Sequence, residues 1–288
     1  MLSNRLVTAL APALWGTTYF VTTEHLPPDR PLLAGLLRSL PAGLLLVAVT
    51  RRAPSGGWWW RSLVLGALNI GAFFPLLFLA AYRLPGGVAA TVGAVQPLIV
   101  AGLATGLLGQ RMSPRVALAA VAGIAGVSLL VLRAEARLDW LGVAAALGGA
   151  AAMAVGTVLG KRWGSPASLP AGTGWQLVAG GLLLLPVTLL VEGLPPALSA
   201  ANAAGYAYLA VIGAALAYSL WFRGIRLLPA TEVAFLGLLS PVVATAVGRL
   251  ALGQDLTAAQ VLGAVVVLAA LVAAQARVRE PRAGRGVG

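Results

Sequence analysis

The sequence predicts an all-α membrane protein whose ten transmembrane helices form two inverted five-helix repeats. Of its 288 residues, 59% are hydrophobic and only 10% are charged, whereas a soluble domain carries about 25% charged residues. Apolar stretches of about 20 residues, long enough to cross a bilayer as helices, recur along the whole chain. A pattern of prolines and glycines also occurs twice, with a constant spacing between the copies.

The repeated pattern is clearest toward the end of each half, where equivalent positions are 144 residues apart. Leu84-Pro85 recurs as Leu228-Pro229, Gly93 as Gly237, Pro97 as Pro241, and Leu108-Gly109-Gln110 as Leu252-Gly253-Gln254. A weaker echo near the start of each half links Arg38 with Gln176. Each half contains five spans, an odd number, so the second half enters the membrane from the opposite side. The repeats are therefore expected to be inverted about an axis in the membrane plane.

Ten apolar stretches are expected to cross the bilayer, joined by short connectors. They cover about residues 5–23, 32–50, 60–82, 85–108, 114–132, 140–160, 171–191, 204–222, 228–250 and 257–276. The first repeat is assigned to residues 1–135, the second to residues 136–278, and residues 279–288 to a cytoplasmic tail. Such short connectors leave no room for a soluble catalytic domain.

The net charge of +12 is explained by topology and does not indicate nucleic acid as a partner. With a cytoplasmic N-terminus, 14 of the 20 basic residues fall on the cytoplasmic side, in accord with the positive-inside rule. They are Arg5, Arg51, Arg52, Arg61, Arg111, Arg115, Lys161, Arg162, Arg223, Arg226, Arg277, Arg279, Arg282 and Arg285. The sequence thus predicts a multi-pass protein of the bacterial inner (plasma) membrane with both termini in the cytoplasm.

Residue types that other classes of protein require are missing from the sequence. There is no cysteine, so a disulfide or thiolate metal site cannot form. The single histidine, His25, is expected to be a solvated residue of the first external connector. No Ser/His pair or His/Glu cluster supports an intramembrane enzyme, and neither a metal nor a cofactor is expected. The first span has no acidic residue, which argues against a pump for cationic drugs.

Several short motifs resemble the EamA family of the drug/metabolite transporter superfamily. They are Leu14-Trp15-Gly16-Thr17, Ala80-Ala81-Tyr82-Arg83-Leu84-Pro85, Gln96-Pro97-Leu98 and Leu108-Gly109-Gln110, repeated in the second half through Arg226-Leu227-Leu228-Pro229, Ser240-Pro241-Val242 and Gly253-Gln254. The resemblance covers essentially the whole chain. Each motif is short, and it is their order and spacing in two copies that make the resemblance specific.

The resemblance implies a ten-helix carrier of small metabolites, and within the family the chain is similar to the YddG-type exporters of neutral and aromatic amino acids. Its substrate cavity would be lined by spans 1, 3, 4, 6, 8 and 9. The chain departs from the family pattern at Gln110 and Gln254, where many members carry glutamate. That departure puts any role for a carboxylate at the ends of spans 4 and 9 in doubt.

Polar and aromatic side chains within the spans are the candidate substrate-binding residues, because such groups are costly or specific at membrane depth. Asn69 needs a hydrogen-bond partner within the bilayer, and a substrate, a water molecule or another helix could each provide it. Trp221 and Phe222 fit an aromatic belt near the cytoplasmic end as well as they fit a site. The full set of candidates is Trp15, Thr18, Tyr19, Asn69, Phe73, Phe78, Tyr82, Gln96, Tyr218, Trp221 and Ser240.

Pro97 and Pro241 lie in the middle of spans 4 and 9, and Gln96 and Ser240 directly precede them. A proline inside a helix removes one backbone hydrogen bond and clashes with the preceding turn. A carbonyl freed in this way must face protein or a wet cavity. The matched positions predict paired kinks that gate a cavity.

Two charged residues within the spans have alternative explanations. Glu232, three residues after Pro229, is either an ion-paired residue at a helix N-terminus, close to Arg223 and Arg226, or an intramembrane proton carrier. Arg38 is expected to snorkel outward toward the membrane surface.

Together these features predict an alternating-access exporter of small neutral metabolites, most of all aromatic or other apolar amino acids. Its expected partners are the small-molecule substrate and the lipid bilayer, and it is expected to be a monomer. One alternative is a carrier of another neutral solute or of a drug-like compound. The other is a non-transporting membrane subunit, against which the two inverted halves with matched kinks argue.

Overall fold

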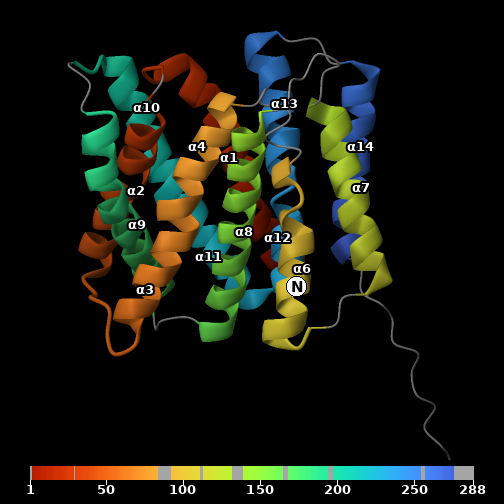
Figure 1. The fold of residues 1–288 in the computed structure, drawn as a ribbon, viewed down its shortest axis with the longest axis horizontal. Coiled ribbons are helices and arrows are strands. Elements are labelled where there is room, and N and C mark those ends of the chain that lie inside the picture. The colour runs from red at the N-terminus through yellow and green to blue at the C-terminus, as the bar shows by residue number, and fades with distance from the viewer. Residues whose placement is uncertain are drawn as a thin grey trace, which may run out of the picture.

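The computed structural model describes residues 2–28, 30–83, 92–110, 113–131, 139–164, 168–193, 197–253 and 257–275, and their regular secondary structure is helical throughout. The helices stand side by side as one bundle (Figure 1). Six of them are long and apolar enough to cross a membrane, and three further apolar helices are shorter. The predicted all-α membrane class is confirmed for this described part of the chain.

The helices follow the expected spans closely. The first half contains α1 (Leu2–His25), α2 (Pro31–Thr50), α3 (Trp58–Gly66), the π-helical turn η1 (Ala67–Ala72), α4 (Phe73–Arg83), α6 (Gln96–Leu108) and α7 (Pro114–Val131). The second half contains α8 (Trp140–Trp163), α9 (Leu169–Val191), α10 (Ala200–Ala210), the π-helical turn η2 (Val211–Leu216), α11 (Ala217–Leu227), α12 (Ala230–Leu236), α13 (Leu239–Leu252) and α14 (Ala258–Gln275). Leu84-Pro85, Gln254 and the tail from residue 276 lie outside the described residues.

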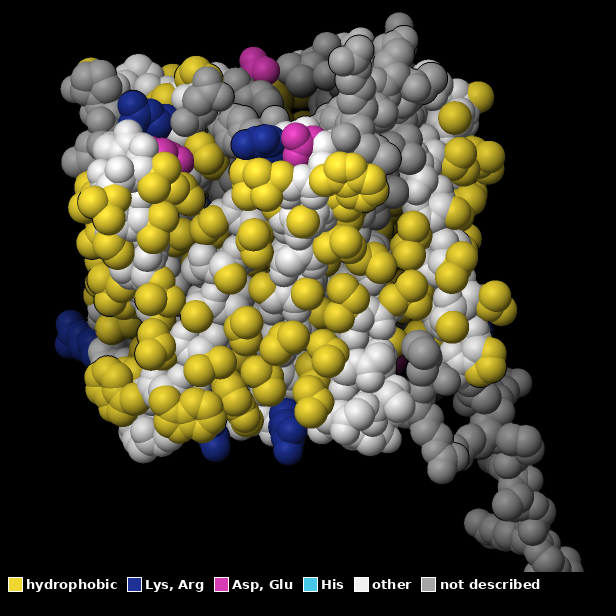
Figure 2. Space-filling view, viewed as in Figure 1, with side chains coloured by type: hydrophobic (Ala, Val, Ile, Leu, Met, Phe, Trp, Pro, Cys, Tyr) yellow, Lys and Arg dark blue, Asp and Glu magenta, His cyan; other side chains and the backbone are white. Residues whose placement is uncertain are grey.

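Hydrophobic side chains cover the face of the bundle seen in Figure 2, and the charged side chains in view gather toward its two ends. Leu190 and Leu250 are 87% and 86% exposed. Such exposure is unfavourable in water and favourable against lipid, so the surface agrees with the apolar composition.

Local sequence explains where several helices begin and end. Asp139 caps α8 by accepting a hydrogen bond from the backbone N–H of Gly142 at 2.8 Å. This bond, supported by the charge of Arg83, holds the pKa of the Asp139 carboxyl below its usual value. Gly109 and Gly253 end α6 and α13 with φ of 65° and 64°, in the left-handed region that glycine adopts without strain. The repeated Leu-Gly-Gln motif therefore includes a helix stop.

His25 differs from its prediction as a solvated residue of a connector. It is the last residue of α1 and is half-buried. Its ring lies 5.9 Å from that of Phe20, and its carbonyl accepts a hydrogen bond from the Asn202 side chain at 2.8 Å. The helix continues further than the apolar stretch because these contacts stabilise its last turn.

Helices of one half pack mainly against helices of the other. The close pairs are α2 with α9, α7 with α14, α4 with α8, α1 with α11, α6 with α8, and α13 with α1. Exchanging each span with its counterpart in the other half turns this set of pairs into itself. Two related halves facing each other produce such a reciprocal pattern.

The two π-helical turns were not predicted from the sequence. They interrupt the long helices α3–α4 and α10–α11 at Ala67–Ala72 and Val211–Leu216, which are equivalent positions 144 residues apart. A π turn inserts one extra residue into a helix and disturbs its regular hydrogen bonding, and such turns are often found at functional sites. Their recurrence in both halves makes them a property of the repeat.

Helix breaks occur near Pro97 and Pro241, but in a different form from the one expected. Turns at residues 94–95 and 237–238 separate short helical segments from α6 and α13. Each proline lies in the first turn of the helix that follows, where a backbone N–H has no intrahelical partner. The expectation that each proline removes a hydrogen bond from a continuous helix is therefore wrong.

Candidate functional site

Aromatic side chains from both halves meet in the core of the bundle. We call Trp15, Phe74, Tyr218, Trp221 and Phe222 the aromatic cluster. Its ring centroids are separated by 5.0 Å for Trp15–Tyr218, 5.1 Å for Trp15–Trp221, 5.5 Å for Tyr218–Phe222 and 6.3 Å for Phe74–Tyr218. These separations are those of favourable aromatic pairs. Phe74 and Tyr218 are equivalent residues of the two halves, so the cluster lies where the halves face each other.

One π turn is held by two side chains that converge on a single carbonyl. Trp15 Nε1 and Arg38 Nη2 each donate a hydrogen bond of 3.0 Å to the carbonyl oxygen of Gly213 in η2. A carbonyl has two lone pairs, and both donors are thereby accommodated. We call Trp15, Arg38 and Gly213 the Gly213 node.

The position of Arg38 contradicts the expectation that it snorkels outward. Its side chain is buried, and its guanidinium lies 5.1 Å from the centroid of the Phe74 ring, in the range of a cation–π interaction. It points inward, where the carbonyl of Gly213 in the π turn accepts its hydrogen bond. Arg38 therefore brings a positive charge next to the aromatic cluster.

The equivalent π turn is held by an amide pair. Asn69 in η1 is 1% exposed, and its Nδ2 donates a hydrogen bond of 3.1 Å to Gln176 Oε1 on α9. Gln176 Nε2 in turn donates to the carbonyl oxygen of Gly172 at 3.3 Å. The Oδ1 of Asn69 is buried without a hydrogen-bond partner among the described residues. A Cβ at Gly156 on α8 would overlap this oxygen. We call Asn69, Gln176 and Gly156 the Asn69 node.

A small cavity borders the Asn69 node. Its volume is about 30 Å³, which is enough for roughly one water molecule and too small for a metabolite. Asn69, Gly156 and Gln176 line its inner part, and Trp58 and Arg226 line it toward the bundle end where α3 begins and α11 finishes. In the present conformation the surrounding helices leave only this small space between the Asn69 node and that end of the bundle.

The structure brings together some of the predicted site residues and separates others. Trp15, Tyr218 and Trp221 lie in the aromatic cluster, and Phe73 adjoins it through a ring separation of 5.8 Å from Phe74. Asn69 lies in its own node. The side chains of Tyr19, Phe78 and Tyr82 lie outside the described part of the structure.

The remaining candidates lie on α1, α6 and α13. Thr18 is buried, and its hydroxyl has no hydrogen-bond partner among the described residues. Gln96 and Ser240 begin the half-helices that carry Pro97 and Pro241, and both are half-buried. Ser240 lies against α1, since a Cβ at Gly16 would come within 2.8 Å of its carbonyl oxygen.

Sequence reasoning missed Phe74, Arg38, Gly213 and Gln176 as members of the site. The signal was present, because Phe74 and Gly213 are 144 residues from the candidates Tyr218 and Asn69, and the Arg38–Gln176 echo was visible. The buried indole Nε1 of Trp221 also has no hydrogen-bond partner among the described residues. A hydrogen-bond acceptor placed beside this donor would be favourable, because a buried polar group gains from any partner that it acquires.

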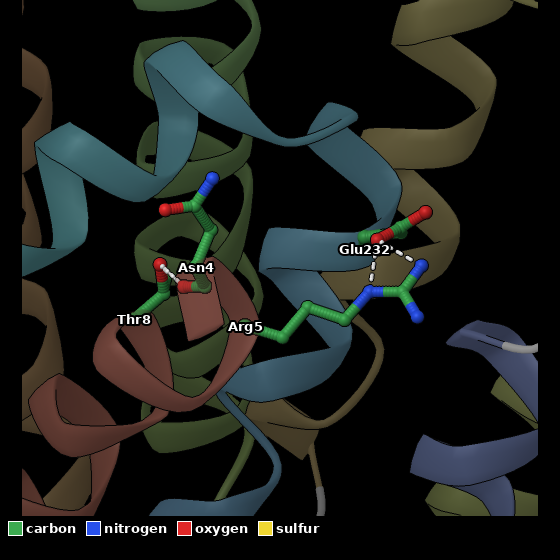
Figure 3. Close-up of polar contacts among 4 residues, drawn as sticks. All are labelled: Asn4, Arg5, Thr8 and Glu232. Atoms are coloured by element: carbon green, nitrogen blue, oxygen red, sulfur yellow. Dashed lines mark hydrogen bonds and ion pairs between the residues drawn. The ribbon is translucent and has the colours of Figure 1, made fainter. Parts of the chain in front are cut away.

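Polar contacts close one end of the bundle at the corner between α11 and α12. Arg5 binds Glu232 through Nε at 2.9 Å and Nη2 at 2.8 Å, as seen in Figure 3 together with Asn4 and Thr8. Arg223 Nη2 donates to Asn4 Oδ1 at 2.9 Å. Glu232 is therefore ion-paired in the first turn of α12, with Arg5 as its partner in place of the expected Arg223 or Arg226.

Lys161, the only lysine in the chain, lies at the same corner. Its Nζ donates hydrogen bonds of 2.8 Å to the carbonyl oxygens of both Arg226 and Leu228. These carbonyls end α11, and a cation at a helix C-terminus is favourable for the helix dipole as well. The end of α8 is thus tied to the same corner as the start of α1.

At the opposite end of the bundle, a more exposed ion pair joins α4 and the start of α8. Arg83 at the end of α4 and Asp139 before α8 form an ion pair of 3.6 Å, and their side chains are 49% and 37% exposed. The Arg5 and Glu232 side chains are each only 19% exposed. Exposed pairs contribute little, so Arg83–Asp139 is expected to be the weaker of these two ion pairs.

A bundle of apolar helices, with buried polar nodes and aromatic residues shared between two related halves, defines a helical membrane protein of the inverted-repeat kind. The chain belongs to the EamA-like transporter family, whose model matches residues 5–132 and again residues 140–274. The resemblance seen in the sequence is confirmed by this match.

Relatives of the chain include other transporters. It is 50% identical to Protein PecM of Dickeya dadantii (strain 3937) over 92% of this chain and 90% of that protein. It is 32% identical to the chloroplastic WAT1-related protein At3g02690 of Arabidopsis thaliana, over 89% of this chain and 66% of that protein. The uncharacterized transporter sll0355 of Synechocystis sp. is 28% identical over 92% of this chain and 88% of that protein.

A solved crystal structure has the same fold. It superposes with a TM-score of 0.82 over 96% of this chain and 97% of its own, at 20% sequence identity. At this identity the likeness concerns the fold alone.

Proposed function

We propose that this transporter exports small neutral metabolites by alternating access, and that aromatic amino acids of the kind carried by YddG-type exporters are its first candidate substrates. The observation that carries the proposal is the aromatic cluster, built from α1, α4 and α11 where the two halves face each other. Its rings suit an aromatic side chain, and the Trp221 N–H suits a polar group of the ligand.

We further propose that ten spans form two inverted repeats, residues 1–135 and 136–278, in a bacterial inner membrane with both termini in the cytoplasm. Three features support the two repeats: the two family matches, the reciprocal helix pairs and the equivalent π turns. The orientation is supported by the excess of basic residues on the side assigned to the cytoplasm. A periplasm-specific reporter fused after residue 288 tests the topology. Activity of that reporter would contradict the proposal.

In this arrangement the α11–α12 corner lies on the cytoplasmic side, and its contacts make the conformation closed there. Opening requires Arg5 to leave Glu232 and the small cavity beside Asn69 to widen. Pro97 and Pro241 flank the turns about which α6 and α13 move. Glu232 remains a candidate proton carrier, because protonation would remove its attraction to Arg5.

The decisive experiment is uptake into liposomes that contain the purified protein, with a panel of labelled amino acids. We expect saturable uptake of tryptophan, tyrosine or phenylalanine, reduced by Tyr218→Ala and unchanged by the exposed variant Trp140→Ala. Uptake of other neutral solutes alone would favour the wider carrier function. The absence of uptake of any compound in a broad panel would favour a non-transporting subunit.

A further inference from the structure

Burying the charged side chain of Arg38 costs more free energy than burying a neutral donor, and a neutral donor would satisfy the Gly213 carbonyl equally well. A neutral side chain satisfies a carbonyl, and burying a guanidinium costs far more than burying an amide. The Asn69 node serves its own π turn with the amide of Gln176, the counterpart of Arg38. The charge of Arg38 is therefore not needed to hold a π turn.

We propose that Arg38 determines substrate specificity: its buried charge selects aromatic substrates that carry a carboxylate and rejects aromatic cations. This inference rests on the proposed function, because it assigns a charge preference to the same aromatic cluster. It concerns an effect through space, so the guanidinium does not have to touch the ligand.

The position of the charge supports this role. Arg38 Nη2 and Trp15 Nε1 bind the same oxygen at 3.0 Å each, so these two nitrogens are at most 6.0 Å apart. The guanidinium is 5.1 Å from the Phe74 ring, which itself packs on Tyr218. Any ligand that contacts the rings of Trp15 or Tyr218 is thus close to the charge.

Burial makes the charge effective. Arg38 is 5% exposed, so water and salt screen it far less than they screen a surface arginine. At separations of this size in a protein interior, one unit charge changes the binding of another by roughly tenfold or more. The sign of the preference is fixed by the positive charge of the guanidinium.

The test uses two ligands that share a ring and differ in charge, indole-3-propionate and tryptamine. Their affinities are measured with the purified full-length protein for the wild type, Arg38→Lys and Arg38→Gln. The matched control is Arg61→Gln, because Arg61 also lies over aromatic rings, 5.7 Å from Trp58 and 5.6 Å from Trp60, but belongs to the end of the bundle where α3 begins.

We expect the wild type, Arg38→Lys and Arg61→Gln to bind the carboxylate at least about tenfold more tightly than the amine. In Arg38→Gln this ratio should fall to about one. An unchanged ratio in folded Arg38→Gln would overturn the proposal and leave Arg38 as a structural donor. A wild type that prefers tryptamine, or binds neither ligand, would overturn it without any variant.

The outcome can be separated from that of the proposed function. If the wild type shows the charge preference but liposomes take up no amino acid, the charge selection stands and the substrate class is wrong. If aromatic amino acids are transported but the protein shows no preference for the carboxylate ligand, the proposed transport function is supported and the proposed role of Arg38 is wrong.

Discussion

The two π turns occupy equivalent positions in the two halves, yet they are held by different chemistry. In the Gly213 node the turn residue has no side chain, and the long Arg38 reaches its backbone. In the Asn69 node the turn residue carries an amide, and the shorter Gln176 meets that amide. The comparison shows that the same interruption of a helix is held by a side chain on a backbone carbonyl in one half and by a pair of amide side chains in the other.

The two nodes also differ in how completely their polar atoms are satisfied. The Gly213 carbonyl accepts two hydrogen bonds, whereas the buried Asn69 Oδ1 has no partner in the described part of the chain. The cavity borders the Asn69 node, where a water or ligand can supply the missing donor. The Gly213 carbonyl is thus fully hydrogen-bonded, whereas the Asn69 node can accept a further hydrogen bond.

The largest expected effect comes from breaking the Asn69 node at Gly156. Gly156→Ala forces a methyl group onto Asn69 Oδ1, and such overpacking costs about 1–3 kcal/mol. Gly102→Ala is the matched control, because nothing lies within 4 Å of a Cβ there. Melting temperatures in detergent should fall for Gly156→Ala and stay level or rise for Gly102→Ala. Equal effects would mean that the node is not closely packed in solution.

The next effect concerns the amide pair itself. Asn69→Ala and Gln176→Ala should each destabilise the protein by about 1–2 kcal/mol, because each leaves a buried partner with one hydrogen bond fewer. The double variant should cost less than the sum of the two, with a coupling of about 1 kcal/mol. Chemical denaturation of the four proteins measures this coupling. Strictly additive effects would contradict the hydrogen bond between Asn69 and Gln176.

A smaller effect is expected in the Gly213 node, where one of two donors can be removed. Trp15→Phe keeps an aromatic ring in the cluster and deletes the Nε1 donor, while Arg38 still binds the carbonyl. We expect a loss of about 0.5–1.5 kcal/mol in unfolding free energy. Trp140→Phe, at a position that is 80% exposed, should have almost no effect. A loss as large as that of Gly156→Ala would mean that the node does not have two independent donors.

The two ion pairs at opposite ends of the bundle provide the fourth test. Glu232→Gln should weaken the end closed by Arg5 by about 1 kcal/mol, whereas Arg83→Gln should change stability by less than about 0.5 kcal/mol, since that pair is exposed. The chain has no cysteine, so Gly160→Cys at the cavity gives a clean labelling site. Its labelling should accelerate with Glu232→Gln and not with Arg83→Gln. Equal rates would show that Arg5–Glu232 does not close this end.

The smallest effect on stability is expected from the paired prolines. Pro97→Ala and Pro241→Ala add an N–H in the first turn of a helix, where it has no intrahelical acceptor, so stability should change by only a few tenths of a kcal/mol. Transport should nevertheless fall, because the flanking turns become free to adopt other geometries. Uptake at the wild-type rate in both variants would show that the prolines do not gate transport.

Much of the fold was predictable because membrane insertion depends on composition and length. The apolar spans and the repeat were predicted from residue types and spacing. The family was inferred from the resemblance of short motifs, and the family match confirms it. The site was predicted less well. Trp15, Tyr218 and Trp221 do meet, but Arg38 was expected at the membrane surface and lies buried beside Phe74.

The sequence by itself determined the set of helices and the relation between the two halves. The length of each hydrophobic stretch and the repeated pattern of prolines and glycines are local properties of the chain. Only the tertiary structure decided which polar side chains turn inward. Arg38 binds Gly213 because α2 and α10–α11, far apart in sequence, bring a bare π-turn carbonyl within its reach. In a lipid environment such a carbonyl must find a donor, and the nearest side chain that can supply one is chosen by packing between helices and not by local sequence.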